Sequence, residues 1–295
     1  MKKTLLPLLA AVFFFGSCKK DDDKKDFIQL QKIESTEDGY NFQYNEQHQL
    51  TRFEVLRSLQ EGAAPVLYRY AIISYENNIP VSADLYNMKE DRSSFYVNTK
   101  ATLHYNGQNK IAFTVAKYYS ESGTYYEGDN DTVNYTFNTD NRLISVKHRG
   151  ESEPWAFTYD AQGNIKFNDK TYQNGNYTDK VVYDLKYDNG INPFNVNGLG
   201  LTLFALYQDN DFDLNQMLSA NNPTYGKIVY TYTDNVNSNV DKYTDLYQYT
   251  NSYDENGGLK EVSYTYDWTH ELNGEPRDHE GNQGSVNVTC VKKQY

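Results

Sequence analysis

The sequence predicts an all-β protein built as one large curved antiparallel sheet or half-barrel of repeated hairpins, with one short helical or apolar insert. Three observations support this fold class. The 295-residue chain contains 29 Tyr and 14 Phe, whose rings pack well on pleated strands. Apolar and polar residues alternate in several segments, as strands with two different faces require. An aromatic residue, a polar turn and an aliphatic residue also recur in this order along the chain.

Residues 1–17 have the pattern of a bacterial lipoprotein signal peptide. Two lysines precede an apolar run over residues 5–15, and small residues lead to Cys18. We therefore expect cleavage between Ser17 and Cys18. A membrane-spanning helix is the alternative, but such a helix needs about 20 apolar residues and is disturbed by a proline such as Pro7.

Residues 18–30 are expected to form a charged flexible tether, because their first part mixes Lys and Asp and offers no apolar surface to bury. Lipidation of Cys18 would attach the protein to the membrane, and each buried methylene of an acyl chain contributes about 0.8 kcal/mol. The Lys/Asp run also resembles the sorting signal of surface-exposed lipoproteins of the Bacteroidota. This resemblance implies an outer-membrane lipoprotein exposed at the cell surface, with the periplasmic leaflet as the alternative.

Net charge and cysteine content limit the partners and the chemistry. The formal charge is −12, and it becomes −14 when Lys2 and Lys3 leave with the signal peptide. A surface of this charge repels nucleic acids and anionic glycans over about 8 Å, so we expect no nucleic-acid partner. With Cys18 acylated, only Cys290 is left, which excludes an internal disulfide. Cys290 lies in an expected strand and is interpreted as a structural thiol rather than a nucleophile.

The hairpin repeat defines a single domain over residues 31–295. Tyr44, Tyr75, Tyr105 and Phe137 are 31, 30 and 32 residues apart, which is enough for a hairpin and its return. Six positions separate the aromatic from the aliphatic residue in five units, and four positions separate them in Tyr75–Ile79 and Tyr187–Ile191. The five longer units are Tyr44–Leu50, Tyr105–Ile111, Phe137–Leu143, Tyr159–Ile165 and Tyr253–Leu259.

Strand alternation is clearest near the end of the chain, where Val262, Tyr264, Tyr266 and Trp268 share one face. The segments 228–232 and 155–159 repeat this pattern. Residues 192–223 do not follow the hairpin repeat and are too apolar for a loop. We expect residues 199–207 to be buried, with a short helix near residues 213–219, so that this insert plugs or caps the sheet.

Taken together, these features are similar to a lipoprotein family of the Bacteroidota whose domain has no known function and a porin-like fold. The resemblance rests on the signal peptide with its Lys/Asp run, the Tyr-turn-Leu hairpins, and the segments Tyr187–Phe194 and Ser219–Pro223. It covers about residues 30–295. It implies a strongly curved sheet, porin-like but soluble, that wraps around the apolar insert, and it carries over no catalytic residue.

A search for chemical motifs yields no catalytic, metal or cofactor site. The five histidines lack metal-ligand spacing, and no Gly-x-Ser-x-Gly motif or phosphate-binding Gly loop is present. Asp209, Asp211 and Asp213 begin like a calcium loop. However, Leu214 replaces the turn glycine and Ala220 replaces the bidentate glutamate.

The candidate binding surface in the sequence is an aromatic hairpin that contains Tyr118, Tyr119, Tyr125 and Tyr126. Consecutive tyrosines place rings on both faces of a β-ribbon, so that one face is exposed to water. The alternative is that these rings shield a sheet edge or pack on a neighbouring hairpin.

The sequence therefore favours a non-catalytic binding or scaffold module that is anchored through Cys18 and recognises a neutral glycan, a peptide or an outer-membrane protein. Two alternatives stay open. A surface polysaccharide hydrolase would need a carboxylate pair at the correct separation in space. A carrier of a hydrophobic ligand would need a cavity that residues 199–207 do not fill.

Overall fold

The computed structural model describes residues 26–294 except 108–109, 127–130, 152 and 208–213. Helices are few in this part of the chain: η1 (Pro193–Gly198, a 3-10 helix), α1 (Leu199–Tyr207) and α2 (Leu214–Leu218). The strands are β1 (Asp26–Glu34), β2 (Asp38–Tyr44), β3 (Leu50–Arg57), β4 (Val66–Glu76), β5 (Ile79–Met88), β6 (Phe95–Tyr105), β7 (Ile111–Tyr118), β8 (Asp131–Phe137), β9 (Leu143–His148), β10 (Trp155–Tyr159), β11 (Ile165–Phe167), β12 (Lys170–Asn174), β13 (Tyr177–Ile191), β14 (Asn221–Asp234), β15 (Asn239–Tyr253), β16 (Leu259–Leu272) and β17 (Glu275–Gln294).

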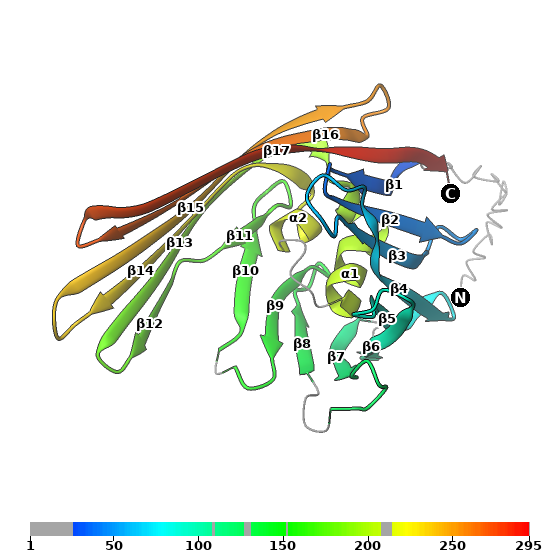
Figure 1. Ribbon diagram of the computed structural model, residues 1–295, viewed down its shortest axis with the longest axis horizontal. Coiled ribbons are helices and arrows are strands. Elements are labelled where there is room, and N and C mark those ends of the chain that lie inside the picture. Colours follow the sequence, from blue (N-terminus) through cyan, green and yellow to red (C-terminus); the bar gives the residue numbers. More distant parts are fainter. Residues whose placement is uncertain (1–25, 108–109, 127–130, 152, 208–213, 295) are drawn as a thin grey trace, which may run out of the picture.

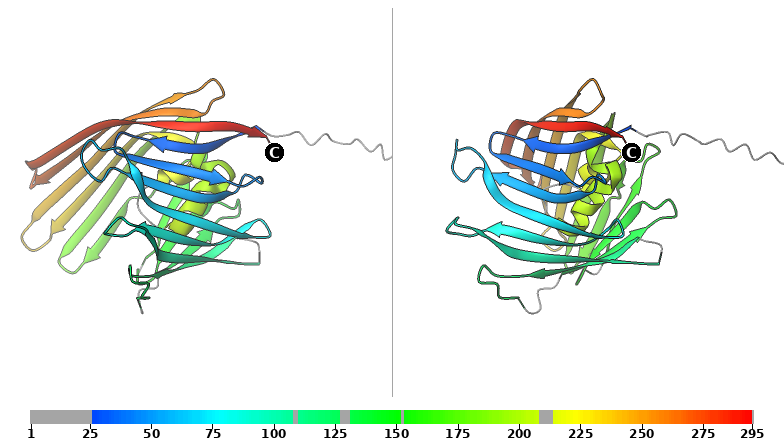
Figure 2. Two further views of the ribbon diagram at one scale, coloured as in Figure 1. Left: turned by 45° about the vertical axis from the view of Figure 1, so that its right-hand side comes forward. Right: turned by 90° about the vertical axis from the view of Figure 1, so that its right-hand side faces the viewer.

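All strands belong to one antiparallel sheet that curls around the helices (Figures 1 and 2). Consecutive strands pair from β1 to β11 and from β12 to β17. The last strand, β17, pairs with the first, with Gln294 opposite Asp26. The sheet stays open between β11 and β12. The predicted all-β fold, a curved sheet of repeated hairpins, is confirmed.

The sheet has two parts with strands of different length. Strands β2–β9 have 6–11 residues and form the barrel part, together with β1, β10 and β11. Strands β13–β17 have 14–20 residues and extend beyond the barrel as a twisted ribbon, which we call the arm together with β12. Figure 1 shows the arm projecting to the left, away from the start of β1 and the end of β17.

The core fills the inside of the barrel part. Phe53 and Ile165 are completely buried in the sheet, and α1 contributes Leu203, Ala205 and Leu206 from the inside. Burying a large aliphatic or aromatic side chain stabilises a fold by about 1.5–3 kcal/mol, so the insert is part of the core. The prediction that residues 199–207 are buried is confirmed for this helix, although Leu201 and Phe204 are only partly buried.

The outer face of the barrel carries charge in mid-strand. Arg52, Asp84, Lys100 and Lys117 lie in one cross-strand row with Ile72, and their chain neighbours on the inner face are buried. Outer-membrane barrels have the reverse polarity, with an apolar band outside and a polar interior. In the part of the chain that the structure describes, no helix has the length and hydropathy needed to cross a membrane.

The recurring motif has a clear structural basis. In all five units with six-residue spacing, the aromatic and the aliphatic residue pair directly across the hairpin, as Tyr44 with Leu50 and Tyr105 with Ile111 show. An Asn or Asp after the aromatic residue closes the turn, because its Oδ1 accepts backbone N–H groups in the turn. These residues are Asn45, Asn106, Asn138, Asp160 and Asp254.

Tyrosine hydroxyls connect successive hairpins. At the end of its strand, each of five motif tyrosines donates a hydrogen bond to a backbone carbonyl in the preceding hairpin or strand. The oxygen-to-oxygen distances are 2.7 Å for Tyr44 to Leu30, 2.9 Å for Tyr75 to Leu50, 2.6 Å for Tyr105 to Pro80, 2.8 Å for Tyr159 to Leu143 and 2.9 Å for Tyr187 to Ile165. Burial raises the pKa of Tyr105 to about 12, so this hydroxyl keeps its proton at neutral pH.

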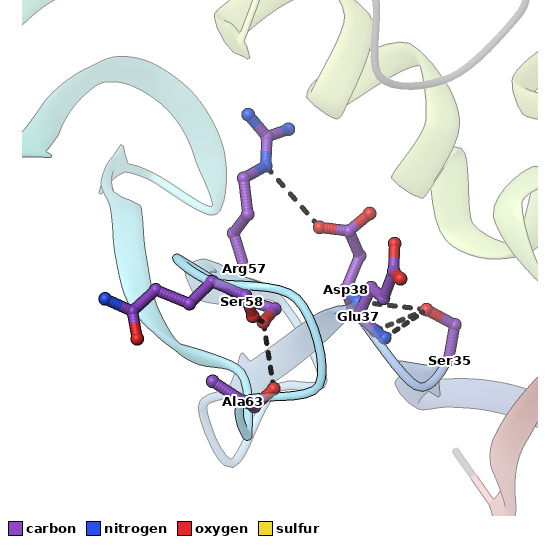
Figure 3. Close-up of polar contacts among 7 residues, drawn as sticks. Ser35, Glu37, Asp38, Arg57, Ser58 and Ala63 are labelled. Atoms are coloured by element: carbon purple, nitrogen blue, oxygen red, sulfur yellow. Dashed lines mark hydrogen bonds and ion pairs between the residues drawn. The ribbon is translucent and has the colours of Figure 1, made fainter.

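At the opposite rim of the barrel, side chains close the loops through bonds to the backbone (Figure 3). Ser35 Oγ accepts the Asp38 N–H at 2.9 Å, and Ser58 Oγ donates to the Ala63 carbonyl at 2.9 Å. Arg57 Nε lies 3.4 Å from the Asp38 carboxylate and joins the two loops. These contacts fix the connections between β1 and β2 and between β3 and β4.

Three details differ from the expected boundaries. The sheet begins at Asp26, inside the segment assigned to the tether (18–30), because Ile28 and Leu30 are buried against the core. The unit Tyr187–Ile191 is no hairpin: it is a bulged end of β13, where Asp188 Oδ1 accepts the Gly190 N–H. Within the insert, residues 199–207 form the helix α1, and β14 already begins at Asn221.

Candidate functional site

One face of the arm is covered with aromatic side chains. The strand register places alternate residues of β13–β16 on the side that continues the inner face of the barrel. We call this surface the arm face. Its aromatic residues are Tyr177, Tyr183, Tyr230, Tyr232, Tyr243, Tyr247, Tyr249, Tyr264, Tyr266 and Trp268, with His270 beside them. Tyr177 and Tyr232 are 51% and 42% exposed and the others are half-buried, so the rings pack against each other while part of each stays accessible.

Neighbouring rings on the arm face hold each other in place. Tyr243 stacks on His270 with ring centroids 4.5 Å apart, and Tyr232 meets Tyr243 edge-on at 5.8 Å. Tyr247 lies 4.8 Å from Tyr266 across the β15–β16 pair. Aromatic pairs of this kind stabilise by about 0.5–1.5 kcal/mol beyond the area they bury. The rings are therefore ordered before any ligand arrives.

Toward the tip of the arm this face forms an open depression of about 520 Å³. It contains four aromatic rings and two carboxylates but no Lys or Arg. Its lining consists of Tyr230, Tyr232, Asp241, Tyr243, Asp245 and Trp268.

The two carboxylates of the depression have partners within the sheet. Asp241 Oδ1 lies 3.2 Å from His270 Nε2, and Asp245 Oδ1 accepts a hydrogen bond from the Tyr266 hydroxyl at 2.9 Å. Burial and this carboxylate raise the pKa of Tyr266 above its ordinary value. Each carboxylate has further lone pairs that can accept hydrogen bonds from a ligand.

The other face of the same strands is mainly polar. Thr231, Lys242, Thr244, Thr265 and Thr269 occupy it, in alternation with the aromatic residues. Because both faces are formed by the same strands, this side provides matched positions for control substitutions.

The aromatic hairpin predicted from the sequence lies at the end of β7. Tyr119 and Tyr125 form an isolated bridge and their ring centroids are 5.6 Å apart, with Lys100 Nζ 6.0 Å from the Tyr119 ring. Tyr118 is half-buried, and burial together with Asp131 raises its pKa, whereas Tyr126 is 47% exposed. The Tyr126 N–H donates to the Tyr118 carbonyl at 3.1 Å, so the structure brings the four tyrosines together in two pairs. Ligand binding at this hairpin stays a prediction.

The sequence also drew attention to Cys290, to the histidines and to a run of aspartates. Burial raises the pKa of the Cys290 thiol to about 12, with a further contribution from Asp254, so this thiol is protonated at neutral pH. In the described ranges, no cluster of three or more His, Cys, Asp or Glu side chains is arranged to hold a metal. Asp209, Asp211 and Asp213, like Ser17 and Cys18, lie outside the described residues.

Sequence reasoning identified the strands of the arm face but not the surface itself. The alternation in residues 228–232 and 262–268 correctly shows that each strand has an aromatic side. The aromatic sides of β14 and β16 form one surface because both strands pair with β15. β15 contributes Tyr243, Tyr247 and Tyr249 to this surface. The signal that could have revealed it is the high density of Tyr and Trp at alternate positions in three successive long strands.

Comparison with known proteins assigns the fold. A porin-like protein from Bacteroides uniformis has a crystal structure that matches 89% of this chain and 98% of its own, with a TM-score of 0.50 and 14% sequence identity. The chain is similar to it in fold. A porin-like protein from Bacteroides vulgatus is matched over 88% of this chain and 98% of its own, with a TM-score of 0.36 and 12% identity. No family model and no curated protein matches the chain.

Proposed function

We propose that the protein is a lipid-anchored, non-catalytic binding module of the outer membrane that is exposed at the cell surface and binds neutral glycans on its arm face. The observation that supports this proposal is the ordered row of half-exposed rings across β13–β16. Rigid Tyr and Trp side chains provide contact area at a low cost in conformational entropy. Cys18 is the residue through which the anchor would be attached.

The chemistry of the depression favours a neutral sugar. The C–H faces of sugar rings are apolar and lie flat on aromatic rings such as Tyr243 and Trp268. Sugar hydroxyls would donate hydrogen bonds to Asp241 and Asp245. An acidic glycan would meet these carboxylates without a Lys or Arg in the lining to offset them.

The placement of the termini agrees with display at a surface. β1 begins at Asp26, eight residues after Cys18, and its start lies at the end of the molecule opposite to the tip of the arm (Figure 1). Lys292 forms an ion pair with Asp26 and fixes the start of the sheet there. A lipid on Cys18 would therefore leave the arm pointing away from the membrane.

The depression does not support a glycosidase. Its carboxylates, Asp241 and Asp245, are four residues apart on one strand, which places their Cα atoms about 13 Å from each other. Glycosidases hold their two carboxyl groups about 5–9.5 Å apart. The wide spacing of Asp241 and Asp245 therefore favours binding without cleavage by these two carboxylates.

The test is a binding screen of residues 18–295 with Cys18→Ser, a chain that keeps the whole described sheet but carries no acyl group. Neutral gluco-, manno- and xylo-oligosaccharides and acidic oligogalacturonate are titrated by calorimetry, and the recovered sugars are sized. We expect a neutral oligosaccharide to bind intact. We expect Trp268→Ala to weaken binding at least about tenfold, which corresponds to about 1.4 kcal/mol.

The matched control is Thr269→Ala, the next residue on the opposite face of β16. It should bind like the parent protein, whereas Tyr119→Ala reports on the hairpin predicted from the sequence. Equal binding by the parent protein and Trp268→Ala would rule out the arm face as the site. Shortened sugars would instead identify an enzyme.

A further inference from the structure

A second recess lies at the root of the arm, where the arm joins the barrel part. Its volume is about 410 Å³, within the range of small-molecule sites. Residues from β1, β2, η1, α2 and β14–β17 line it. We call it the root cavity. It is separate from the depression near the arm tip, since the two linings share no residue.

The surface of the root cavity is mainly apolar. Leu30, Ile33, Val262, Val286 and Val288 come from three strands that meet at this point. No residue of α1 is part of the lining, although this helix fills much of the barrel. The insert therefore leaves unfilled an apolar space next to the core.

Among the described residues, no charged side chain and no histidine lines the root cavity, although the chain has a formal charge of −12. A charged group that entered this space would lose hydration without gaining an ionic partner, which is costly. The lining therefore selects for an uncharged ligand.

Two asparagines supply hydrogen-bond acceptors at the polar side of the cavity. Asn222 Nδ2 donates to the Ile191 carbonyl and to the Tyr253 hydroxyl at 3.1 and 2.9 Å. Asn251 Nδ2 donates to the Asp188 carboxylate and the Pro223 carbonyl at 2.9 and 3.0 Å. Because both amide nitrogens already donate within the protein, the two Oδ1 atoms are left to accept hydrogen bonds from a ligand.

We propose that the root cavity binds an uncharged amphiphile, a molecule with an apolar chain or ring system and a hydroxyl or N–H donor at one end. The apolar part packs on the valines and leucines, and the donor meets Asn222 or Asn251. Burial of apolar area drives binding, and the amides select the orientation. Tyr247, Tyr249 and Tyr264 of the arm face line one side of this cavity, whereas the depression near the arm tip, where the glycan is proposed to bind, shares no lining residue with it.

The test compares two fluorescent probes that share one apolar body. N-phenyl-1-naphthylamine is uncharged and has an N–H donor, and 1-anilinonaphthalene-8-sulfonate adds a single negative charge. Each is titrated into residues 18–295 carrying Cys18→Ser. We expect the uncharged probe to bind at least about tenfold more tightly, because the sulfonate has no partner in the cavity. Equal affinities, or no binding of the uncharged probe, would overturn the proposal.

Displacement of the bound uncharged probe by other amphiphiles tests which polar end group the cavity accepts. 1-Dodecanol should displace the probe, whereas dodecanoate, which is charged, and 1-methoxydodecane, which lacks the donor, should need higher concentrations. Displacement by all three at the same concentration would contradict the roles of the charge-free lining and the amide oxygens.

A pair of substitutions on β17 locates the site. Val286→Trp places an indole in the cavity and should weaken binding of the uncharged probe at least about tenfold. Val291→Trp changes the same residue type at a position that is 39% exposed, and it should leave binding unchanged. Trp268→Ala on the arm face should also leave it unchanged, so failure of this proposal and failure of the glycan proposal are distinguishable. Unchanged binding in a folded Val286→Trp protein, or loss in Trp268→Ala, would place the probe elsewhere.

Discussion

At the scale of single residues, the repeated tyrosines explain why the chain is so rich in this amino acid. A tyrosine at the end of a motif strand packs its ring against the core, and its hydroxyl donates a hydrogen bond to a carbonyl of the neighbouring hairpin, as Tyr75 does to Leu50. Two units depart from this rule: the Tyr253 hydroxyl donates to the Asp188 carboxylate, and Phe137 occupies the position that is tyrosine in the units on either side. The same backbone therefore provides a natural comparison with and without the hydroxyl.

We expect Tyr105→Phe and Phe137→Tyr to have opposite effects on the free energy of unfolding. Tyr105→Phe removes the hydrogen bond to the Pro80 carbonyl and should lower the free energy of unfolding by about 0.5–1.5 kcal/mol. Phe137→Tyr adds a hydroxyl that by analogy reaches the Ile111 carbonyl at the start of β7, and it should raise the free energy of unfolding by a similar amount. Urea denaturation measures both changes. A loss of stability in Phe137→Tyr would show that this unit has no room for the hydroxyl.

The residue pattern was readable from the sequence wherever both partners lie within one hairpin. The spacing of six in Tyr159–Ile165 predicted a hairpin, and the structure confirms it, with these two residues paired directly across the strands. The same reasoning was wrong for Tyr187–Ile191, because Asp188 bonds locally to Gly190 and turns the expected hairpin into a bulge. The hydrogen bonds from tyrosine hydroxyls to the neighbouring hairpin could not be predicted, because the sequence of one unit does not show which carbonyl accepts them.

At the scale of elements, the insert depends on a close approach between its two α-helices. A Cβ added at Gly200 on α1 would lie 2.0 Å from the carbonyl oxygen of Met217 on α2, far inside van der Waals contact. The composition of residues 192–223 predicted burial and a helical region, but this contact depends on how the two helices pack. Glycine is thus required here for space rather than for backbone conformation.

Gly200→Ala should therefore push α1 and α2 apart. We expect it to lower the free energy of unfolding by about 1–3 kcal/mol through overpacking, as measured by thermal or urea denaturation. Gly107→Ala is the control, because a Cβ at that turn position meets no atom within 4 Å. It should change stability by less than about 0.5 kcal/mol. Equal stability of the two variants would mean that α2 shifts freely, and that the insert is not fixed to the core.

At the scale of the whole molecule, the insert also contacts the open sheet at its β11 edge. β11 and β12 do not complete the barrel by pairing, and the segment after α2 lies at this seam. The Ala220 N–H donates to the Gly163 carbonyl at 3.2 Å, and the Asn221 N–H donates to Asn164 Oδ1 at 2.8 Å. A chain segment from the insert thus bonds to the turn between β10 and β11, beside the open edge of the sheet. The fold class was predictable from hairpins, whereas these contacts join residues more than 50 positions apart.

Ser219→Ala tests whether these contacts hold the seam together. Ser219 is completely buried, and its Oγ accepts the Ile165 N–H at 3.0 Å. Loss of the Ser219 hydroxyl leaves the buried Ile165 N–H without this acceptor and should lower the free energy of unfolding by about 1–3 kcal/mol. Hydrogen exchange at Ile165 should accelerate more than exchange in β3 or β5, because the effect is local to the seam. Ser252→Ala, at an exposed position of β15, should change neither quantity. Unchanged exchange at Ile165 would show that β11 is held by the barrel part alone, and that the insert fills the sheet without closing it.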